Sequence, residues 1–142
     1  MTFEVFLNFN DGKCREAMEF YAQVFKSTVQ DVVLFRDMPS TPDYPIPESE
    51  GDRIMYATVK IGDKNIMFMD MSSDYKAIMG NNITPAVTMD DHAEIDRIAN
   101  ELANDGTMIM APQKVSWSNH YAMITDKFGI TWHVYDPQMP QQ

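Results

Sequence analysis

The sequence has little of what marks exported, membrane and disulfide-bonded proteins. Its single cysteine cannot form an internal disulfide. None of its apolar runs approaches the roughly 20 residues that a membrane-spanning helix needs. The first residues, Met1 to Glu4, also lack the basic and then apolar order of a secretion signal. These absences predict a cytoplasmic protein that has no membrane span.

Positive charge is also scarce. The chain has 11 lysine and arginine residues against 21 aspartate and glutamate residues, a net charge of -10, and no basic cluster. An acidic surface repels phosphate backbones and anionic lipid headgroups, which excludes nucleic acid and membranes as expected partners. Glycine-rich phosphate loops, nucleophilic triads and zinc-finger spacings are absent as well. The sequence therefore lacks the signatures of these common catalytic and nucleotide-binding classes.

A repeated hairpin is the strongest pattern that the sequence contains. Residues 117–136 show two alternating runs of apolar and polar residues around a turn, which is typical of a β-hairpin. Residues 56–71 align with residues 121–136 without a gap. In this alignment Tyr56 matches Tyr121, and Phe68 matches His133. Two copies of one hairpin predict a duplicated fold.

The segments around the two hairpins repeat the same order of elements. Hydrophobic periodicity predicts a strand, a helix, a strand and a hairpin in each half. In the first half the predicted elements are residues 3–9, 13–25, 29–36, 54–61 and 65–71. In the second half they are residues 83–89, a helix capped by Asp90 and Asp91, residues 107–111, a loop at 112–119, and the hairpin at 121–135. A proline-rich acidic loop at 37–52 is a lid, an arm that reaches a partner subunit, or a solvated excursion.

These elements predict an α+β fold made of two βαβββ modules. A strand with a helix beside it buries one sheet face and leaves the other face free. Two such modules are expected to form a mixed, curved sheet around a shared cup, with the helices outside. The expected parts of this single domain are module one at 1–72, a linker at 73–82, module two at 83–136 and a tail at 137–142.

Three segments carry a family resemblance. They are residues 11–17 (DGKCREA), residues 20–25 (FYAQVF) and the stretch from Trp117 to Trp132. In these segments the chain resembles the PhnB-like branch, often labelled demethylubiquinone methyltransferase-like, of the vicinal oxygen chelate superfamily of glyoxalases, bleomycin resistance proteins and dioxygenases. The resemblance implies a glyoxalase-like fold and a homodimer. Methyl transfer is not expected, because no glycine-rich loop follows a strand to hold a methyl-donor nucleotide.

The resemblance also implies where a metal ion would bind. Metal-dependent members of the superfamily carry histidine or glutamate at four cup-facing positions, which fall here on Glu4, Thr84, Phe68 and His133. Phe68 cannot ligate a metal, and Asp70, two positions along and expected on the same face, is the evident replacement. Because a catalytic divalent site normally has at least three protein ligands, we expect no bound metal. One divalent metal ion is the alternative.

Four further side chains are candidates for roles at the site. His133 is expected to face Glu4 across the cup and is the best candidate for an acid, base or hydrogen-bonding role. The alternative is an interior histidine whose hydrogen bonds are all made within the protein. His120 either rims the pocket or faces water. Trp117 lies outside the strand alternation and is a candidate pocket wall. Cys14, in the first turn of a helix, is either a reactive thiol or a packed apolar side chain.

The leading functional hypothesis is a protein that binds a small apolar or aromatic molecule without a metal; whether it catalyses a reaction is left open. One alternative is a metal-dependent lyase, isomerase or dioxygenase, and another is a regulatory or scaffolding protein whose cup is filled by its own side chains. The catalytic candidates are His133 and Glu4. The ligand-binding candidates are Phe6, Asn8, Tyr56, Phe68, Asp70, Thr84, Trp117, His120, Tyr121 and Tyr135.

Overall fold

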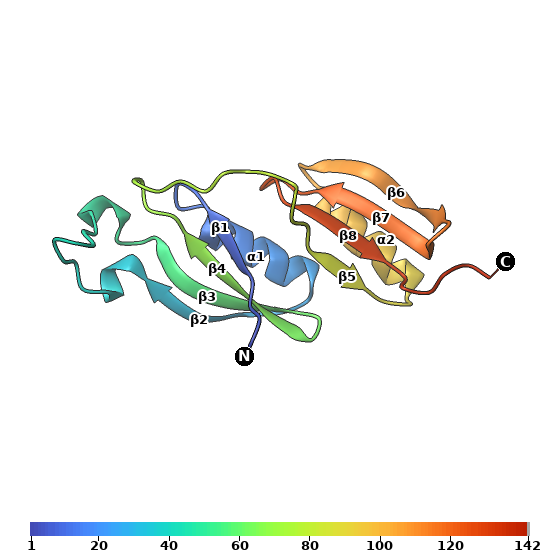
Figure 1. The fold of residues 1–142 in the computed structure, drawn as a ribbon, viewed down its shortest axis with the longest axis horizontal. Coiled ribbons are helices and arrows are strands. Elements are labelled where there is room, and N and C mark those ends of the chain that lie inside the picture. Colours follow the sequence, from blue (N-terminus) through green and yellow to red (C-terminus); the bar gives the residue numbers. More distant parts are fainter. Residues whose placement is uncertain (142) are drawn as a thin grey trace. The chain divides into compact units, whose positions relative to one another are not determined.

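Two compact units make up the computed structural model, which describes residues 1–141. The first unit ends at Ile78 and the second begins at Met79. Each unit contains one α-helix and four β-strands in the order βαβββ, as predicted (Figure 1). No helix within residues 1–141 is both long and apolar enough to cross a membrane.

The first unit builds a mixed four-stranded sheet. Its elements are β1 (Phe6–Phe9), α1 (Cys14–Val24), β2 (Val29–Leu34), β3 (Ile54–Ile61) and β4 (Lys64–Asp70). The strand order is β1-β4-β3-β2, with β1 parallel to β4 and the other pairs antiparallel. Two short 3-10 helices, η1 (Phe35–Asp37) and η2 (Glu48–Glu50), lie in the connection between β2 and β3.

That connection is anchored to the unit at its second end. The Glu50 side chain is buried, accepts a hydrogen bond from the Ser73 N–H at 3.1 Å and pairs with Arg53 at 3.4 Å. Arg53 also donates to the carbonyl oxygen of Met71 at 2.8 Å. Residues 38–45, earlier in the connection, are exposed. A role for this loop as a lid or an arm stays a prediction.

One face of the first sheet packs under α1 (Figure 1). Apolar side chains recur along α1 at helical spacing, and those that are buried include Ala17, Met18, Tyr21 and Val24. The ring of Tyr21 lies 5.7 Å from the ring of Phe68, which is fully buried and stacks on Phe9 at 6.0 Å. Burying one phenylalanine side chain contributes about 1.5 to 3 kcal/mol. The Phe68 ring is thus a central part of this core.

The second unit builds a sheet of the same kind. Its elements are β5 (Ala86–Thr88), α2 (His92–Leu102), β6 (Thr107–Val115), β7 (Ser118–Thr125) and β8 (Thr131–Tyr135). The strand order is β5-β8-β7-β6, with β5 parallel to β8. The start of α2 agrees with the predicted cap, because the Asp91 side chain accepts a hydrogen bond from the Glu94 N–H at 3.1 Å.

The predicted loop at residues 112–119 is wrong, because β6 and β7 extend through most of it. Pro112 favoured a loop, since proline lacks the N–H that a strand ladder uses. β6 is an edge strand of its sheet, however, and an edge strand tolerates a missing N–H on its open side. The two strands meet in a turn at residues 116–117. Trp117 therefore lies in the turn between β6 and β7.

The helix-facing side of the second sheet is apolar. The buried side chains of α2 are Ile95, Ile98, Ala99 and Leu102, and those of β7 and β8 include Ala122, Ile124, Trp132 and Val134. The Trp132 indole N–H donates to Oδ2 of Asp126 at 2.9 Å. The Oδ1 oxygen of Asp126 accepts hydrogen bonds from the N–H groups of Phe128 at 2.9 Å and Ile130 at 3.1 Å. One carboxylate thus fixes the turn of this hairpin.

The two hairpins are equivalent in their first strands. Ala57 on β3 and Ala122 on β7 are both fully buried. Ala57 is the partner of helix-packed Phe68 in the β3–β4 ladder, which places it on the helix-facing side. Because side chains alternate along a strand, Tyr56 and Tyr121, each one residue earlier, occupy equivalent places on the opposite face. The predicted duplication is confirmed.

The second strands depart from the ungapped alignment by one residue. Phe68 pairs with Ala57, whereas Val134 pairs with Ala122. Val134 is therefore the counterpart of Phe68. The predicted match between Phe68 and His133 is wrong.

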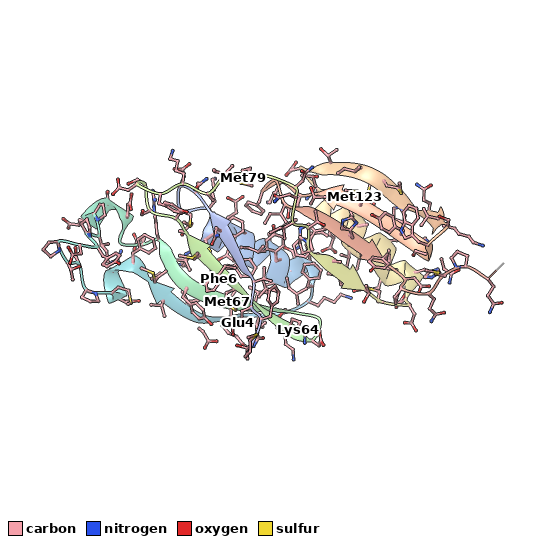
Figure 2. The ribbon with its side chains drawn as sticks, in the orientation of Figure 1. Glu4, Phe6, Lys64, Met67, Met79 and Met123 are labelled. Atoms are coloured by element: carbon pink, nitrogen blue, oxygen red, sulfur yellow. The ribbon has the colours of Figure 1, made fainter. Side chains whose placement is uncertain are left out.

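The shift arises because the turns differ in length. Ten residues, 58–67, separate Ala57 from its partner Phe68, whereas eleven residues, 123–133, separate Ala122 from its partner Val134. One residue of slip moves every later side chain to the other sheet face. The β4 residue equivalent to His133 is therefore Met67, which lies beside Phe6 of β1 (Figure 2).

Candidate functional site

Three side chains of the second unit form a hydrogen-bonded chain on the sheet face opposite α2. The phenol oxygen of Tyr121 on β7 lies 2.5 Å from Nδ1 of His133 on β8. Nε2 of the same imidazole lies 2.9 Å from the hydroxyl oxygen of Thr84, which precedes β5. β8 lies between β5 and β7, so its free-face histidine reaches a neighbour on each side. Both ring nitrogens of His133 are thereby engaged.

Aromatic rings surround this chain. The ring of Tyr135 lies 5.8 Å from the ring of Tyr121, its direct cross-strand partner. Trp117 meets Tyr121 edge to face, with ring centroids 5.5 Å apart. Trp117 is 50% exposed, whereas Tyr121 is 7% exposed. The site is an aromatic surface crossed by one polar chain.

Burial controls the protonation of Tyr121. Loss of solvent raises the pKa of the Tyr121 phenol above its ordinary value, and the neighbouring Tyr135 adds to the effect. The phenol therefore keeps its proton at neutral pH. A protonated phenol donates one hydrogen bond and also accepts, as the Thr84 hydroxyl does. This arrangement can hold a polar group of a ligand at one end of the chain.

The residues of this face do not fit a divalent metal ion. Of the four positions that the resemblance implies, the second unit supplies Thr84 and His133. Threonine offers a neutral hydroxyl, and both nitrogens of His133 already form hydrogen bonds. Within residues 1–141, no group of three or more His, Cys, Asp or Glu side chains is arranged to hold a metal.

Phe68 and Asp70 lie on the helix-facing side of the first sheet, so their predicted place on the free face is wrong. Phe68 packs against α1. The Asp70 carboxylate, 1% exposed, accepts hydrogen bonds from the N–H of Cys14 at 2.9 Å and the N–H of Ile54 at 2.8 Å. Both errors follow from the one-residue shift between the hairpins. Asp70 joins α1 to β3 and is not a ligand anchor on the free face.

Asp70 and Cys14 form a buried pair of titratable groups. Burial raises the pKa of the Asp70 carboxyl, although hydrogen bonds from Ile54 and Cys14 and the charges of Arg53 and Arg15 act in the opposite direction. Burial also raises the pKa of the fully buried Cys14 thiol, and the charge of Asp70 adds to this. A thiol that stays protonated is a poor nucleophile. The structure favours the packed cysteine over the reactive one.

The free face of the first sheet carries a second aromatic group. The rings of Phe6 and Tyr56 meet edge to face with centroids 6.3 Å apart. The Thr58 hydroxyl donates to the phenol oxygen of Tyr56 at 3.3 Å. No histidine takes part in this contact, because the position equivalent to His133 is Met67. The two tyrosines are thus equivalent in place and different in hydrogen bonding.

Two polar candidates lie on or before β1. Asn8 is on β1, two residues after Phe6 and therefore on the same face, where its backbone pairs with Met69 of β4. Glu4 precedes β1 and is exposed. The predicted facing of Glu4 and His133 across a shared cup stays a prediction, as does the cup itself.

His120 points toward α2, so both places predicted for it, the pocket rim and open water, are wrong. Its Nε2 lies 2.6 Å from a carboxylate oxygen of Asp96 on α2. Its ring stacks on the ring of His92 with centroids 4.6 Å apart, and Nε2 of His92 lies 2.9 Å from Asp136. Alternation along β7 (Ser118–Thr125) is the sequence signal for this cluster. His120 lies two residues before the buried Ala122, so a strand that begins at Ser118 places both side chains on the helix-facing side.

Comparisons with known proteins agree over most of the chain. A model of the family described as 3-demethylubiquinone-9 3-methyltransferase matches residues 2–135. Protein YjdN of Escherichia coli (strain K12) is 27% identical over 129 residues, which cover 87% of each chain. A Pseudomonas aeruginosa protein of known crystal structure is 30% identical, with a TM-score of 0.82 over 97% of this chain and 98% of that one.

Two further structures support the family and the fold. A putative 3-demethylubiquinone-9 3-methyltransferase, PhnB protein, from Bacillus cereus is 25% identical, with a TM-score of 0.76 over 96% of this chain and 99% of that one. A glyoxylase/bleomycin resistance protein/dioxygenase domain from Frankia sp. is 10% identical, with a TM-score of 0.66 over 97% and 98% of the two chains, which shows the fold alone. The chain therefore belongs to the 3-demethylubiquinone-9 3-methyltransferase family, as a PhnB-like protein with the glyoxalase-like α+β fold.

Proposed function

We propose that the protein binds a small apolar or aromatic molecule, without a metal ion, on the free face of the β5–β8–β7–β6 sheet. The observation that carries this proposal is the set of rings around Tyr121, with Tyr135 at 5.8 Å and Trp117 at 5.5 Å. Small-molecule sites are mostly apolar and aromatic, with few polar groups that fix orientation. The chain from Tyr121 through His133 to Thr84 supplies such polar groups.

The exposure of Trp117 supports the same proposal. Tryptophan is the largest apolar side chain, and half of this one faces solvent beside an otherwise covered tyrosine. A flat ring of this size offers a ligand a large contact area at little cost in side-chain entropy. A ligand that stacks on Trp117 would cover it while its polar group reaches the hydrogen-bonded chain. Sequestration of an aromatic compound, in the manner of bleomycin resistance proteins, is one use of such a site.

The test is a thermal-shift screen of aromatic compounds on the wild-type protein. At a ligand concentration of 100 times Kd, binding to the folded state stabilises it by about 2.7 kcal/mol, which raises the melting temperature by several degrees. The Trp117→Ala variant should lose this shift. Tyr44→Ala, which removes an exposed aromatic ring in the first unit, should keep it. Absence of a shift with every compound would overturn the proposal.

A metal-assisted lyase, isomerase or dioxygenase is the competing function. Elemental analysis of protein purified without chelator distinguishes the two functions. A divalent ion at one equivalent per chain would overturn metal-free binding, particularly if His133→Ala removed the ion.

We also propose that the protein is a homodimer in the cytoplasm. The family resemblance supports the dimer, and the single cysteine agrees with a reducing compartment. Sedimentation equilibrium at micromolar concentration measures the assembly state directly. A mass of one chain across that range would contradict the dimer.

A further inference from the structure

The order of hydrogens along the Tyr121–His133–Thr84 chain determines what the site offers a ligand. A neutral imidazole has one N–H donor and one nitrogen acceptor, so two orders are available. In the first order, Tyr121 donates to Nδ1 and Nε2–H donates to Thr84. In the second order, Thr84 donates to Nε2 and Nδ1–H donates to Tyr121. Each order leaves one hydroxyl hydrogen free, at opposite ends of the chain.

Burial selects between these orders. Tyr121 is 7% exposed, and among residues 1–141 its phenol oxygen has one hydrogen-bonding partner, Nδ1 of His133 at 2.5 Å. The second order would leave the phenol hydrogen without an acceptor in a nearly solvent-free place, which lowers that population about fivefold or more. The first order leaves the free hydrogen on Thr84, which is only half-buried. The first order is therefore the stable one.

The chemistry of Tyr121 agrees with this order. The raised pKa of its phenol keeps the hydrogen on the oxygen. A phenol donating at 2.5 Å fixes the imidazole as its Nε2–H tautomer. The Thr84 oxygen then accepts from Nε2 at 2.9 Å and has its own hydrogen left to donate. Successive hydrogen bonds polarise one another, which strengthens the outermost donor.

We propose that Thr84 donates its hydroxyl hydrogen to the ligand, so that the site takes an aromatic or apolar molecule that carries an acceptor oxygen, such as a ketone. This inference rests on the proposed function, because it assigns the polar group of the ligand bound there. Thr84 contacts the ligand, and Tyr121 and His133 are positioning residues that set the direction of its hydrogen.

The binding experiment compares acetophenone with α-methylstyrene, which has the same shape but a methylene group in place of the carbonyl oxygen. In an NMR titration of the intact protein, acetophenone should bind about five- to tenfold more tightly, the value of one hydrogen bond. The Thr84→Val variant keeps the shape of residue 84 without its hydroxyl and should bind the two compounds equally. Tyr75→Phe, at an exposed tyrosine outside every helix and strand of the first unit, should keep the preference.

The outcomes separate the two proposals. Equal binding of both probes by the wild-type protein, or a preference that survives Thr84→Val, overturns the donor role while leaving apolar binding intact. Failure of acetophenone to bind overturns the donor role, and the proposed function is overturned with it if no compound of the thermal-shift screen binds either. Retained binding by a variant also shows that the variant is folded.

The imidazole itself gives an independent measurement. The ¹⁵N shifts of His133 should show a protonated Nε2 and an unprotonated Nδ1 at neutral pH. In Tyr121→Phe, the donor to Nδ1 is removed and Thr84 becomes free to donate to Nε2, so the tautomer should move toward Nδ1–H and the preference for acetophenone should fall. A wild-type protein with Nδ1 protonated would overturn the proposal.

Discussion

The Oδ1 oxygen of Asp70 accepts a hydrogen bond of 2.9 Å from the backbone N–H of Cys14, the first residue of α1. The Oδ2 oxygen accepts another, of 2.8 Å, from the N–H of Ile54 at the start of β3. The first N–H groups of a helix have no partner within the helix. One buried carboxylate therefore satisfies two backbone donors that would otherwise lose their hydrogen bonds to water.

Asp70→Asn should lower the free energy of unfolding by about 1 to 3 kcal/mol, because the amide has one acceptor oxygen where the structure uses two. Urea unfolding at neutral pH measures the difference. Asp63→Asn, in the exposed turn between β3 and β4, should change stability by less than about 0.5 kcal/mol. Equal stability of the two variants would show that Asp70 is not a structural cap.

A second prediction tests the shift between the hairpins. Phe68 is fully buried under α1, while Phe6, on the free face, is 44% exposed. Phe68→Ala should cost about 3 to 5 kcal/mol, because it removes a ring and leaves a cavity in the core.

Phe6→Ala is the matched control, since it removes the same ring from a partly solvated surface. Its cost should be well below that of Phe68→Ala in the same denaturation assay. The opposite ranking would return Phe68 to the free face and restore the ungapped alignment.

The local parts of the fold were predictable from the sequence, and the parts that depend on strand partners were not. The Asp91 cap follows from spacing within one segment, and the equivalence of Tyr56 and Tyr121 follows from the likeness of two strands before their turns. The mismatch of Phe68 with His133 depended on turn lengths, which alternation alone does not reveal. Pro112 appeared as a loop signal because its strand could not be recognised as an edge before the strand order was known.

The individual residues of the site were predictable from the sequence, and the contacts between them were not. Thr84, Tyr121 and His133 were each candidates, but the hydrogen bonds that join them need the order β5-β8-β7, which brings segments from distant parts of the chain together. The pairing of His120 with Asp96 was missed for a related reason. It joins β7 to α2, and the predicted strand began at residue 121, one residue after His120.

A third prediction concerns pH. The hydrogen bond from His92 holds the pKa of the Asp136 carboxyl below its ordinary value, and the N–H of Gln138 at 2.9 Å adds to this. A carboxyl whose pKa is lower when folded stabilises the protein above its unfolded pKa, about 3.9. That contribution is lost as the pH falls through the folded pKa.

Asp136→Asn should therefore be less stable than the wild type at pH 5, and the gap should narrow toward pH 3. Urea unfolding across this range provides the measurement. Asp63→Asn should keep a nearly constant gap, because that exposed side chain has only a surface partner, Lys64. A gap for Asp136→Asn that widens on acidification would contradict the predicted role.

The last prediction uses the two tryptophans as reporters. Trp117 is 50% exposed in the turn beside the proposed site, and Trp132 is 2% exposed with its indole N–H bonded to Asp126. Acrylamide should quench Trp117 severalfold more strongly than Trp132. Trp117→Phe should therefore leave a blue-shifted emission that resists quenching, whereas Trp132→Phe should leave a red-shifted emission that is readily quenched.

The same measurement reports on binding. An aromatic ligand that stacks on Trp117 should protect its emission from acrylamide in the wild-type protein and in Trp132→Phe, provided that circular dichroism shows this core variant to be folded. Trp117→Phe should show no change in quenching on addition of the same ligand. Protection that persisted in Trp117→Phe would place the ligand near the buried indole instead, and the free face around Tyr121 would then not be its site.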